Sequence, residues 1–349
     1  MRESNRPAAA RLAIVVPCYN EEEVLPETSR RLLALLGRLE RAGLVANDSA
    51  IYFVDDGSRD RTWSVVEALS ASDPRVVGVK LSRNRGHQNA LLAGLFTAQG
   101  DAIVSVDADL QDDIEVIEDM VVRYREGSDL VFGVRRSRET DTRFKRTTAR
   151  LYYRMLRAIG IDVVFDHADF RLLSRRAIDA LSGYAEVNMF LRGIIPLLGF
   201  PAATVYYDRG ERFAGVSKYP LRRMLGLAID GITSFSVVPL RLVTALGFIV
   251  CLLSAVMIAW VAYGAFVVNA TAPGWASTVL PVYLLGGIQL LALGILGEYV
   301  AKIYLETKRR PRYLIERVTR SAALPFAEDD ASLASGQRPR ATATPAARP

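Results

Sequence analysis

The chain has 349 residues, of which 50% are apolar and 23% are charged, and its formal net charge is +6. This length accommodates one sizeable domain with additional segments. The two cysteines, Cys18 and Cys251, argue against a disulfide framework or a thiolate metal site. Nucleic acid is not an expected partner, because no nucleic-acid motif is present and the positive charge gathers near apolar stretches, which favours anionic lipid. The apolar run at 12–17 is too short for a signal peptide.

The first 135 residues alternate short apolar runs with helical patterns. We expect strands at 12–17, 51–54, 76–81, 102–106 and 130–134. Helices are expected between them, near 22–42, 60–71, 87–98 and 113–126. Because strands this apolar are buried on both faces, the alternation predicts an α/β domain with a doubly wound, mainly parallel sheet that binds ligands at the carboxyl ends of its strands. A dinucleotide-binding domain is excluded, because CYNEEE follows the first strand without a glycine turn.

The pattern changes after residue 135. We expect a basic helix at 143–159, a short strand at 169–173, two helices up to about 198 and a strand at 203–207. Residues 219–236 mix apolar and basic positions, which is typical of a helix that lies on a membrane surface. The tail after about residue 322 is rich in Ala, Pro, Ser and Arg and is expected to be disordered.

Two stretches near the C-terminus, 242–268 and 276–297, contain no charged residue. Each is long enough to cross a bilayer as a helix, and two in tandem favour membrane spans over buried core helices. Arginine and lysine residues flank the pair on both outer sides, whereas the connecting loop NATAPGW is uncharged. Because positive flanks stay in the cytoplasm, we expect an integral membrane protein with two spans, and with the soluble domain and both termini cytoplasmic.

Polar side chains follow the fourth expected strand. Asp107, Asp109 and Gln111 stand at alternate positions, so they point the same way in an extended segment. Three oxygen-bearing side chains suit a hard cation, Mg²⁺ or Mn²⁺, that shares its coordination shell with phosphate. The alternative is a solvated acidic loop that caps the next helix, a role that Asp112 and Asp113 fit.

Further motifs stand at the ends of the other strands: VVPCYNEEE at 15–23, VDDGSRDRT at 54–62 and LSRNRGHQNALLAG at 81–94. With VSVDADLQDD at 104–113, their order and spacing resemble the inverting glycosyltransferases of family 2, which have the GT-A fold. The match continues through DFRLLSRRAIDAL (169–181), NMFLRG (188–193), GVSKYP (215–220) and the two apolar stretches. This combination is similar to the polyprenyl-phosphate glycosyltransferases, a group that includes dolichyl-phosphate mannose synthase and bacterial undecaprenyl-phosphate glucosyltransferases. The resemblance covers roughly residues 10–315.

The resemblance implies metal-dependent, inverting transfer of a single sugar from a UDP- or GDP-sugar to polyprenyl phosphate at the cytoplasmic membrane face. It implies that the nucleotide-sugar is bound by Pro17, Tyr19, Asn20, Glu21, Asp55, Asp56, Arg83 and Asp107. The metal on the diphosphate would be held by Asp107, Asp109 and Gln111. The acceptor phosphate would be bound by Arg135, Ser217 and Lys218. The expected catalytic residues are Asp169, Asp109, Arg135 and Lys218. The resemblance also suggests a homo-oligomer.

Two details stay open. Asp169 matches the acid proposed as catalytic base in the family. A lipid phosphate, however, is already anionic near pH 7, since its second pKa is about 6. Asp169 therefore either abstracts a proton or orients the sugar hydroxyls and shapes the acceptor site. The basic helix departs from the family pattern, because Ala149 stands where the family has a serine. Two roles for this helix therefore stay open: it contacts phosphate, or it only faces lipid headgroups. Its basic residues are Arg143, Lys145, Arg146 and Arg150. The two histidines, His87 and His167, are expected to be structural.

Two other functions were weighed. A processive polysaccharide synthase of the same family would carry a Q-x-x-R-W motif before several spans, and this sequence has neither. An inactive membrane scaffold is disfavoured by the intact D-x-D-x-Q and nucleotide motifs. The predicted divisions are an N-terminal extension (1–10), a GT-A domain (11–218), an interfacial helix (219–240), a transmembrane hairpin (241–305), a cytoplasmic juxtamembrane segment (306–321) and a disordered tail (322–349).

Overall fold

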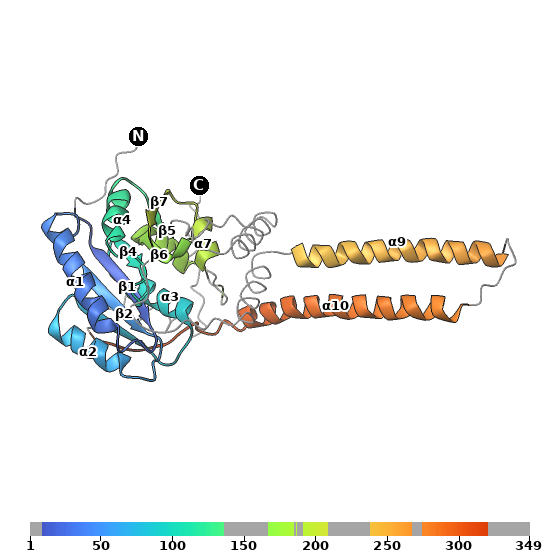
Figure 1. Cartoon of the computed structure of the whole chain (residues 1–349), viewed down its shortest axis with the longest axis horizontal. Coiled ribbons are helices and arrows are strands. Elements are labelled where there is room, and N and C mark those ends of the chain that lie inside the picture. Colours follow the sequence, from blue (N-terminus) through green and yellow to red (C-terminus); the bar gives the residue numbers. More distant parts are fainter. Residues whose placement is uncertain are drawn as a thin grey trace, which may run out of the picture.

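The computed structural model describes residues 9–135, 167–184, 186, 191–208, 238–266 and 274–319. Within these residues, one eight-stranded sheet runs in the order β7-β5-β6-β4-β1-β2-β3-β8 (Figure 1). The strands are β1 Leu12–Cys18, β2 Ala50–Asp55, β3 Val76–Leu81, β4 Ala102–Ser105, β5 Leu130–Arg135, β6 His167–Ser174, β7 Ala202–Tyr207 and β8 Ile315–Val318. All seven strands expected from the sequence are present, and β8 is additional.

The sheet is mixed, with a parallel half and a mostly antiparallel half. Strands β4, β1, β2 and β3 are parallel neighbours, as the strand–helix alternation predicted. Strand β6 runs antiparallel between β4 and β5, and β5 pairs in parallel with β7. The carboxyl ends of β1, β2 and β4 therefore meet at one edge of the sheet, and the start of β6 reaches that same edge.

Helices cover both faces of the sheet. Along β1, Leu12, Ile14 and Val16 belong to one buried cluster, whereas Ala13 and Val15 belong to the other. The first cluster includes α1 (Leu25–Arg41), α2 (Thr62–Ser72) and α4 (Val116–Arg125). The second includes α3 (His87–Thr97), α6 (Arg175–Ser182) and α7 (Leu191–Leu197). This double coverage explains why the strands read as continuous apolar runs in the sequence.

The approach of α3 to the sheet depends on one glycine. A Cβ atom on Gly94 would lie 2.3 Å from Val15 Cγ1 and 2.8 Å from Val54 Cγ2. No real side chain fits at those distances, so glycine lets the helix pack directly onto β1 and β2. The close packing fixes the start of α3, which carries His87, against the carboxyl edge of the sheet.

Two long helices follow the soluble part, α9 (Val238–Phe266) and α10 (Trp275–Thr307), and they contact one another. Figure 1 shows them extending together away from the sheet. Their large apolar side chains are exposed, as for Phe248 (72%), Trp260 (75%) and Leu290 (72%), which suits contact with lipid. Among the described residues, one segment is long and apolar enough to cross a membrane, Leu284–Thr307 in α10. The second span stays a prediction, and the interfacial helix expected at 219–236 lies outside the described residues.

The chain after α10 returns to the sheet, which the sequence analysis did not expect. Strand β8 pairs antiparallel with β3 at the edge of the sheet. Just beyond it, the Thr319 backbone N–H donates to the Gly78 carbonyl (3.0 Å), and Thr319 Oγ1 accepts from the Gly78 N–H (2.9 Å). The Thr319 hydroxyl also bonds the Ser70 hydroxyl of α2 (2.7 Å). Burial of the connecting segment raises the pKa of Tyr313 to about 12.

We predict that Thr319→Val lowers the free energy of unfolding by about 1–3 kcal/mol, because it leaves a backbone N–H and a hydroxyl without their partner. The measurement is a denaturant titration of the solubilised full chain. The control is Glu316→Gln, which removes only the exposed ion pair with Lys80 (3.0 Å) and should cost less than about 1 kcal/mol. Equal effects of the two changes would show that β8 is not docked as described.

Candidate active site

The loops after β1 and β2 are tied together at the carboxyl edge. Asn20 adopts a positive φ of 55°, and its side-chain oxygen accepts from the Arg59 N–H (2.9 Å), while its own N–H donates to Ser58 Oγ (3.0 Å). The Glu21 N–H donates to Thr62 Oγ1 (2.9 Å). Tyr19 beside them is 40% exposed. These bonds hold the polar residues expected to bind a nucleotide in one rigid corner next to Pro17, at the end of β1.

Asp55 is the last residue of β2 and Asp56 follows it, and both are buried. Asp56 accepts from the backbone N–H groups of Arg85 (2.7 Å) and Gly86 (2.8 Å), so it anchors the loop that leads into α3. Desolvation raises the pKa of each carboxyl group. One oxygen of Asp55 is buried with no hydrogen-bond partner among the described residues. Arg83, the basic residue expected near a nucleotide, is exposed on the same loop.

The loop after β4 carries Asp107, Asp109 and Gln111, all half-buried. It turns sharply, with Leu110 at φ 56°, and the Gln111 N–H donates to Asp109 Oδ1 (3.2 Å). Desolvation in this corner raises the pKa of Asp107, and three neighbouring carboxylates add to the rise, partly offset by His87. The structure thus gathers negative charge where the sequence predicted a cation.

These residues fit a divalent cation. Their donors are all oxygen, which Mg²⁺ and Mn²⁺ prefer. The pKa of Asp107 is raised mainly by desolvation and further by three neighbouring carboxylates, so a cation would stabilise its charged form. Within the described part of the chain, no group of three or more His, Cys, Asp or Glu side chains forms a ready-made metal cage. An ion here would therefore take further ligands from water or from a phosphate group.

Asp169 lies beside this loop and is surrounded by cationic groups. Its Oδ1 is 2.6 Å from Arg171 Nη2, and its Oδ2 is 3.1 Å from Arg192 Nη2. His87 Nε2 lies 3.6 Å from both Asp169 Oδ2 and Asp107 Oδ1, so the imidazole bridges the two carboxylates. Although burial alone would raise it, the pKa of Asp169 is held well below its usual range by His87 and the two arginines.

The sequence analysis did not find three of these residues. His87 was expected to be structural, but it lies between the two carboxylates. Arg171 was not singled out, although it is fully buried two residues along β6 from Asp169. Arg192 was quoted only within a motif. The available signal for Arg171 was the spacing, because residues i and i+2 of a strand lie on the same face.

Arg135, expected to bind an acceptor phosphate, lies at the end of β5 in contacts of its own. Its Nη2 is 3.3 Å from Asp112 Oδ1, and its Nε donates to the Tyr207 hydroxyl (3.1 Å). Tyr207 in turn donates to Asp112 Oδ1 (2.7 Å). Asp112 is thus buried in a network, whereas Asp113 accepts from the Glu115 N–H (3.1 Å) and caps the turn before α4, as the helix-capping alternative proposed for it. The other expected acceptor residues, Ser217 and Lys218, and the basic helix at 143–159 lie outside the described residues.

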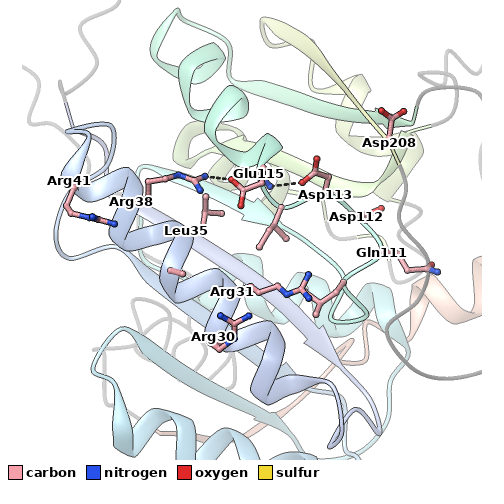
Figure 2. A pocket seen from close by; sticks show the side chains of 13 residues that line it. Arg30, Arg31, Leu35, Arg38, Arg41, Gln111, Asp112, Asp113, Glu115 and Asp208 are labelled. Atoms are coloured by element: carbon pink, nitrogen blue, oxygen red, sulfur yellow. Dashed lines mark hydrogen bonds and ion pairs between the residues drawn. The ribbon is translucent and has the colours of Figure 1, made fainter.

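A cavity of about 560 Å³ lies between α1 and residues 110–115 of the loop after β4. Figure 2 shows Arg38 of α1 reaching toward Glu115, beside Asp113. The cavity adjoins the site through Gln111 and Asp112 but does not include Asp107 or Asp109. The arginines that line the cavity are exposed, and Arg31 and Arg38 pair with glutamates. The cavity is therefore separate from the carboxylate cluster.

Comparisons with known proteins identify the family of the chain. The family model described as glycosyl transferase family 2 matches residues 13–182. The chain is 52% identical over 310 residues to a Bacillus subtilis protein named "Uncharacterized glycosyltransferase YkoT", covering 87% of this chain and 91% of that protein. It is 40% identical over 307 residues to the bactoprenol glucosyl transferase of Shigella phage SfX, covering 88% and 99%. A solved structure, the mannosyltransferase PcManGT from Pyrobaculum calidifontis, shares 19% identity at a TM-score of 0.42 and covers 85% of each chain; so distant a likeness adds nothing to the sequence relatives.

We predict that Asp169→Asn lowers the free energy of unfolding by about 3–5 kcal/mol at neutral pH, because it leaves the Arg171 charge buried without its closest counter-charge. Because the folded pKa of Asp169 is depressed, its contribution is complete above the unfolded value of about 3.9 and is lost as pH falls through the folded pKa. The difference between wild type and variant should therefore shrink only in strong acid.

The double variant Asp169→Asn/Arg171→Met should recover much of the loss, since it removes the buried charge as well. Denaturant titration of each full-length chain measures the cycle. If Asp169→Asn costs no more than Asp113→Asn, an exposed carboxylate change, the pairing described here is wrong.

Proposed function

This chain belongs to glycosyl transferase family 2, its mixed α/β sheet is the GT-A fold implied by the sequence, and we propose that it transfers one sugar from a nucleotide-sugar to a polyprenyl phosphate. The observation that carries the proposal is the 40% identity, over 88% of the chain, to a protein named bactoprenol glucosyl transferase. The carboxylate cluster at the carboxyl edge of the sheet supports the donor half of the reaction, since ligands of such sheets bind there.

The corner between β1 and β2 would bind the nucleoside. Tyr19, Asn20 and Glu21 lie on one loop, and the buried Asp55 and Asp56 face it from the end of β2. We assign the base and ribose to these two aspartates, because buried carboxylates at a strand end offer acceptors to hydroxyl and N–H groups. Arg83 would approach the nucleotide phosphates from the next loop.

Asp107, Asp109 and Gln111 would hold a divalent cation, Mg²⁺ or Mn²⁺. When bound, such an ion stabilises the negative charge that develops on a departing diphosphate. The sharp turn at Leu110 and the bond between the Gln111 N–H and Asp109 keep the three side chains within one loop. His87 lies 3.6 Å from Asp107 Oδ1, and the Asp107 side chain is 35% exposed, so part of the carboxylate stays open to a ligand.

For Asp169, the observed contacts favour orientation over proton abstraction. A carboxylate whose pKa is strongly depressed is a weak base, and Asp169 is paired with two guanidinium groups. The acceptor phosphate needs little base assistance, since it is already anionic at neutral pH. We therefore assign Asp169 to the positioning of the sugar and acceptor groups.

The acceptor phosphate would be bound by Arg135, Ser217 and Lys218, as the family resemblance implies. Arg135 is held by Asp112 and Tyr207, so its guanidinium is fixed in place before a ligand arrives. A planar guanidinium can bind two anionic groups at once through its five N–H donors. A phosphate would share Arg135 with Asp112 and would not need to displace it.

We predict that the solubilised full chain transfers sugar from a UDP- or GDP-sugar to undecaprenyl phosphate only with Mg²⁺ or Mn²⁺ present. Asp109→Asn should lower the rate by roughly a hundredfold or more, since the cation loses a charged ligand and the developing charge loses part of its stabilisation. The measurement is formation of the lipid-linked sugar. Asp113→Asn is the matched control, because that exposed aspartate accepts from the Glu115 N–H in the turn before α4, and an asparagine oxygen can accept the same bond.

Three results would overturn parts of this proposal. Transfer that continues after chelation would show that the reaction needs no metal. A wild-type transfer rate for the Asp109→Asn variant would show that Asp109 is not a metal ligand. Chain elongation of a polysaccharide without added polyprenyl phosphate would replace the proposed reaction with processive synthesis.

We also propose that α9 and α10 span the membrane with the catalytic domain on the cytoplasmic side. A reporter inserted next to Gly274, between the two helices, should lie outside, and one fused after Pro349 should lie inside. The physical reason is the arginine and lysine residues on the outer flanks of the pair. Accessibility of each reporter in intact cells measures this, and the reverse pattern would place the domain away from cytosolic nucleotide-sugars.

A further inference from the structure

The cluster around Asp169 contains more cationic groups than its carboxylate needs. Arg171, Arg192 and His87 all lie within 3.6 Å of one Asp169 carboxylate oxygen or the other. Two of these side chains are always charged, against one carboxylate charge. The cluster lies at the edge of the sheet where Asp107 and its loop also end, and His87 joins it to the Asp107 carboxylate.

The two arginines differ in what they can do. Arg171 is fully buried on β6, and its side chain cannot leave Asp169 without stranding a buried charge. Its Nε and Nη1 atoms are buried with no hydrogen-bond partner among the described residues, so it is committed to this spot. Arg192 comes from α7, a different element, and its side chain is 42% exposed.

Asp169 does not depend on Arg192 for its counter-charge. If Arg192 turned away, Asp169 would still be bound by Arg171 at 2.6 Å, so no buried carboxylate would be left unpaired. The Arg192 contacts are also the longer ones, at 3.1 Å through Nη2 and 3.4 Å through Nε. A charged group that is exposed and replaceable beside a fixed ion pair is suited to binding an incoming anion.

We propose that Arg192 binds a phosphate group in the active site, with Asp169 and Arg171 acting as the fixed pair that holds it ready. The inference rests on the proposed function, which supplies two phosphate-bearing substrates. They are the lipid acceptor, with its phosphate, and the donor, with its diphosphate. Both present the same chemistry to a guanidinium, namely oxygen atoms in the plane of its N–H fork. Arg192 is therefore a ligand-contact residue, and Asp169 positions it.

The test uses equilibrium binding to the solubilised full chain, which does not depend on turnover. One arm titrates UDP with Mn²⁺, and the other titrates a short-chain prenyl phosphate. Arg192→Gln should weaken one of these by roughly 10- to 100-fold, the effect of losing one charge-assisted contact to an anion. Arg192→Lys should recover only part of the affinity, since an ammonium group cannot reproduce a forked contact.

The control is Arg123→Gln, which removes another carboxylate-paired, half-exposed arginine on α4 (2.8 Å from Glu126) and should change neither affinity. A loss in the prenyl phosphate arm assigns Arg192 to the acceptor, and a loss in the UDP arm assigns it to the donor. Unchanged affinity in both arms, with a fall only in kcat, would show that Arg192 merely orients Asp169 and would overturn the proposal. Absence of transfer by the wild-type chain would count against the proposed function and leave the binding result standing.

Discussion

The charge of Arg171, buried in the middle of the sheet, is the constraint on which the site depends. A guanidinium with no exposure to water requires a counter-charge, and Asp169, two residues along the same strand, supplies it. Strand β6 is held in place by β4 and β5 on either side, and the Ser105 hydroxyl of β4 donates to the Asp169 carbonyl. The pair therefore stands at a fixed point, and the elements that bring His87 and Arg192 have to meet it there.

The parallel half of the sheet contributes through its loops. Asp56 binds two backbone N–H groups ahead of α3, and Gly94 lets that helix pack against β1 and β2. Together these contacts determine where His87 lies, and His87 connects Asp169 to Asp107. The loop that leaves β2 toward α3 and the carboxylate loop after β4 are thus linked to the antiparallel strand through one imidazole.

Much of the fold could be predicted from the sequence, because strands buried on both faces leave long apolar runs that differ clearly from the helices between them. The positions of Asp55 and Asp107 at one edge followed from the same pattern, whereas Asp169 was named only through the family resemblance. His87 could not be assigned, because a single histidine after a glycine carries no periodic signal and its partners are 20 and 82 residues away along the chain. Arg192 was missed for the same reason, and β8 because IERV is short, half-charged and separated from its partner strand by the whole domain.

Strand β8 links the end of α10 to the sheet. Seven residues, 308–314, separate α10 from β8, and even fully extended they span only about 25 Å. Strand β8 lies at one end of the sheet order, and β7, after which the chain continues toward α9, lies at the other. The two long helices are therefore connected to opposite edges of one sheet, with β1, β4 and β6 between those edges. Because residues 308–314 reach only about 25 Å, the β8 edge of the sheet stays close to the end of α10.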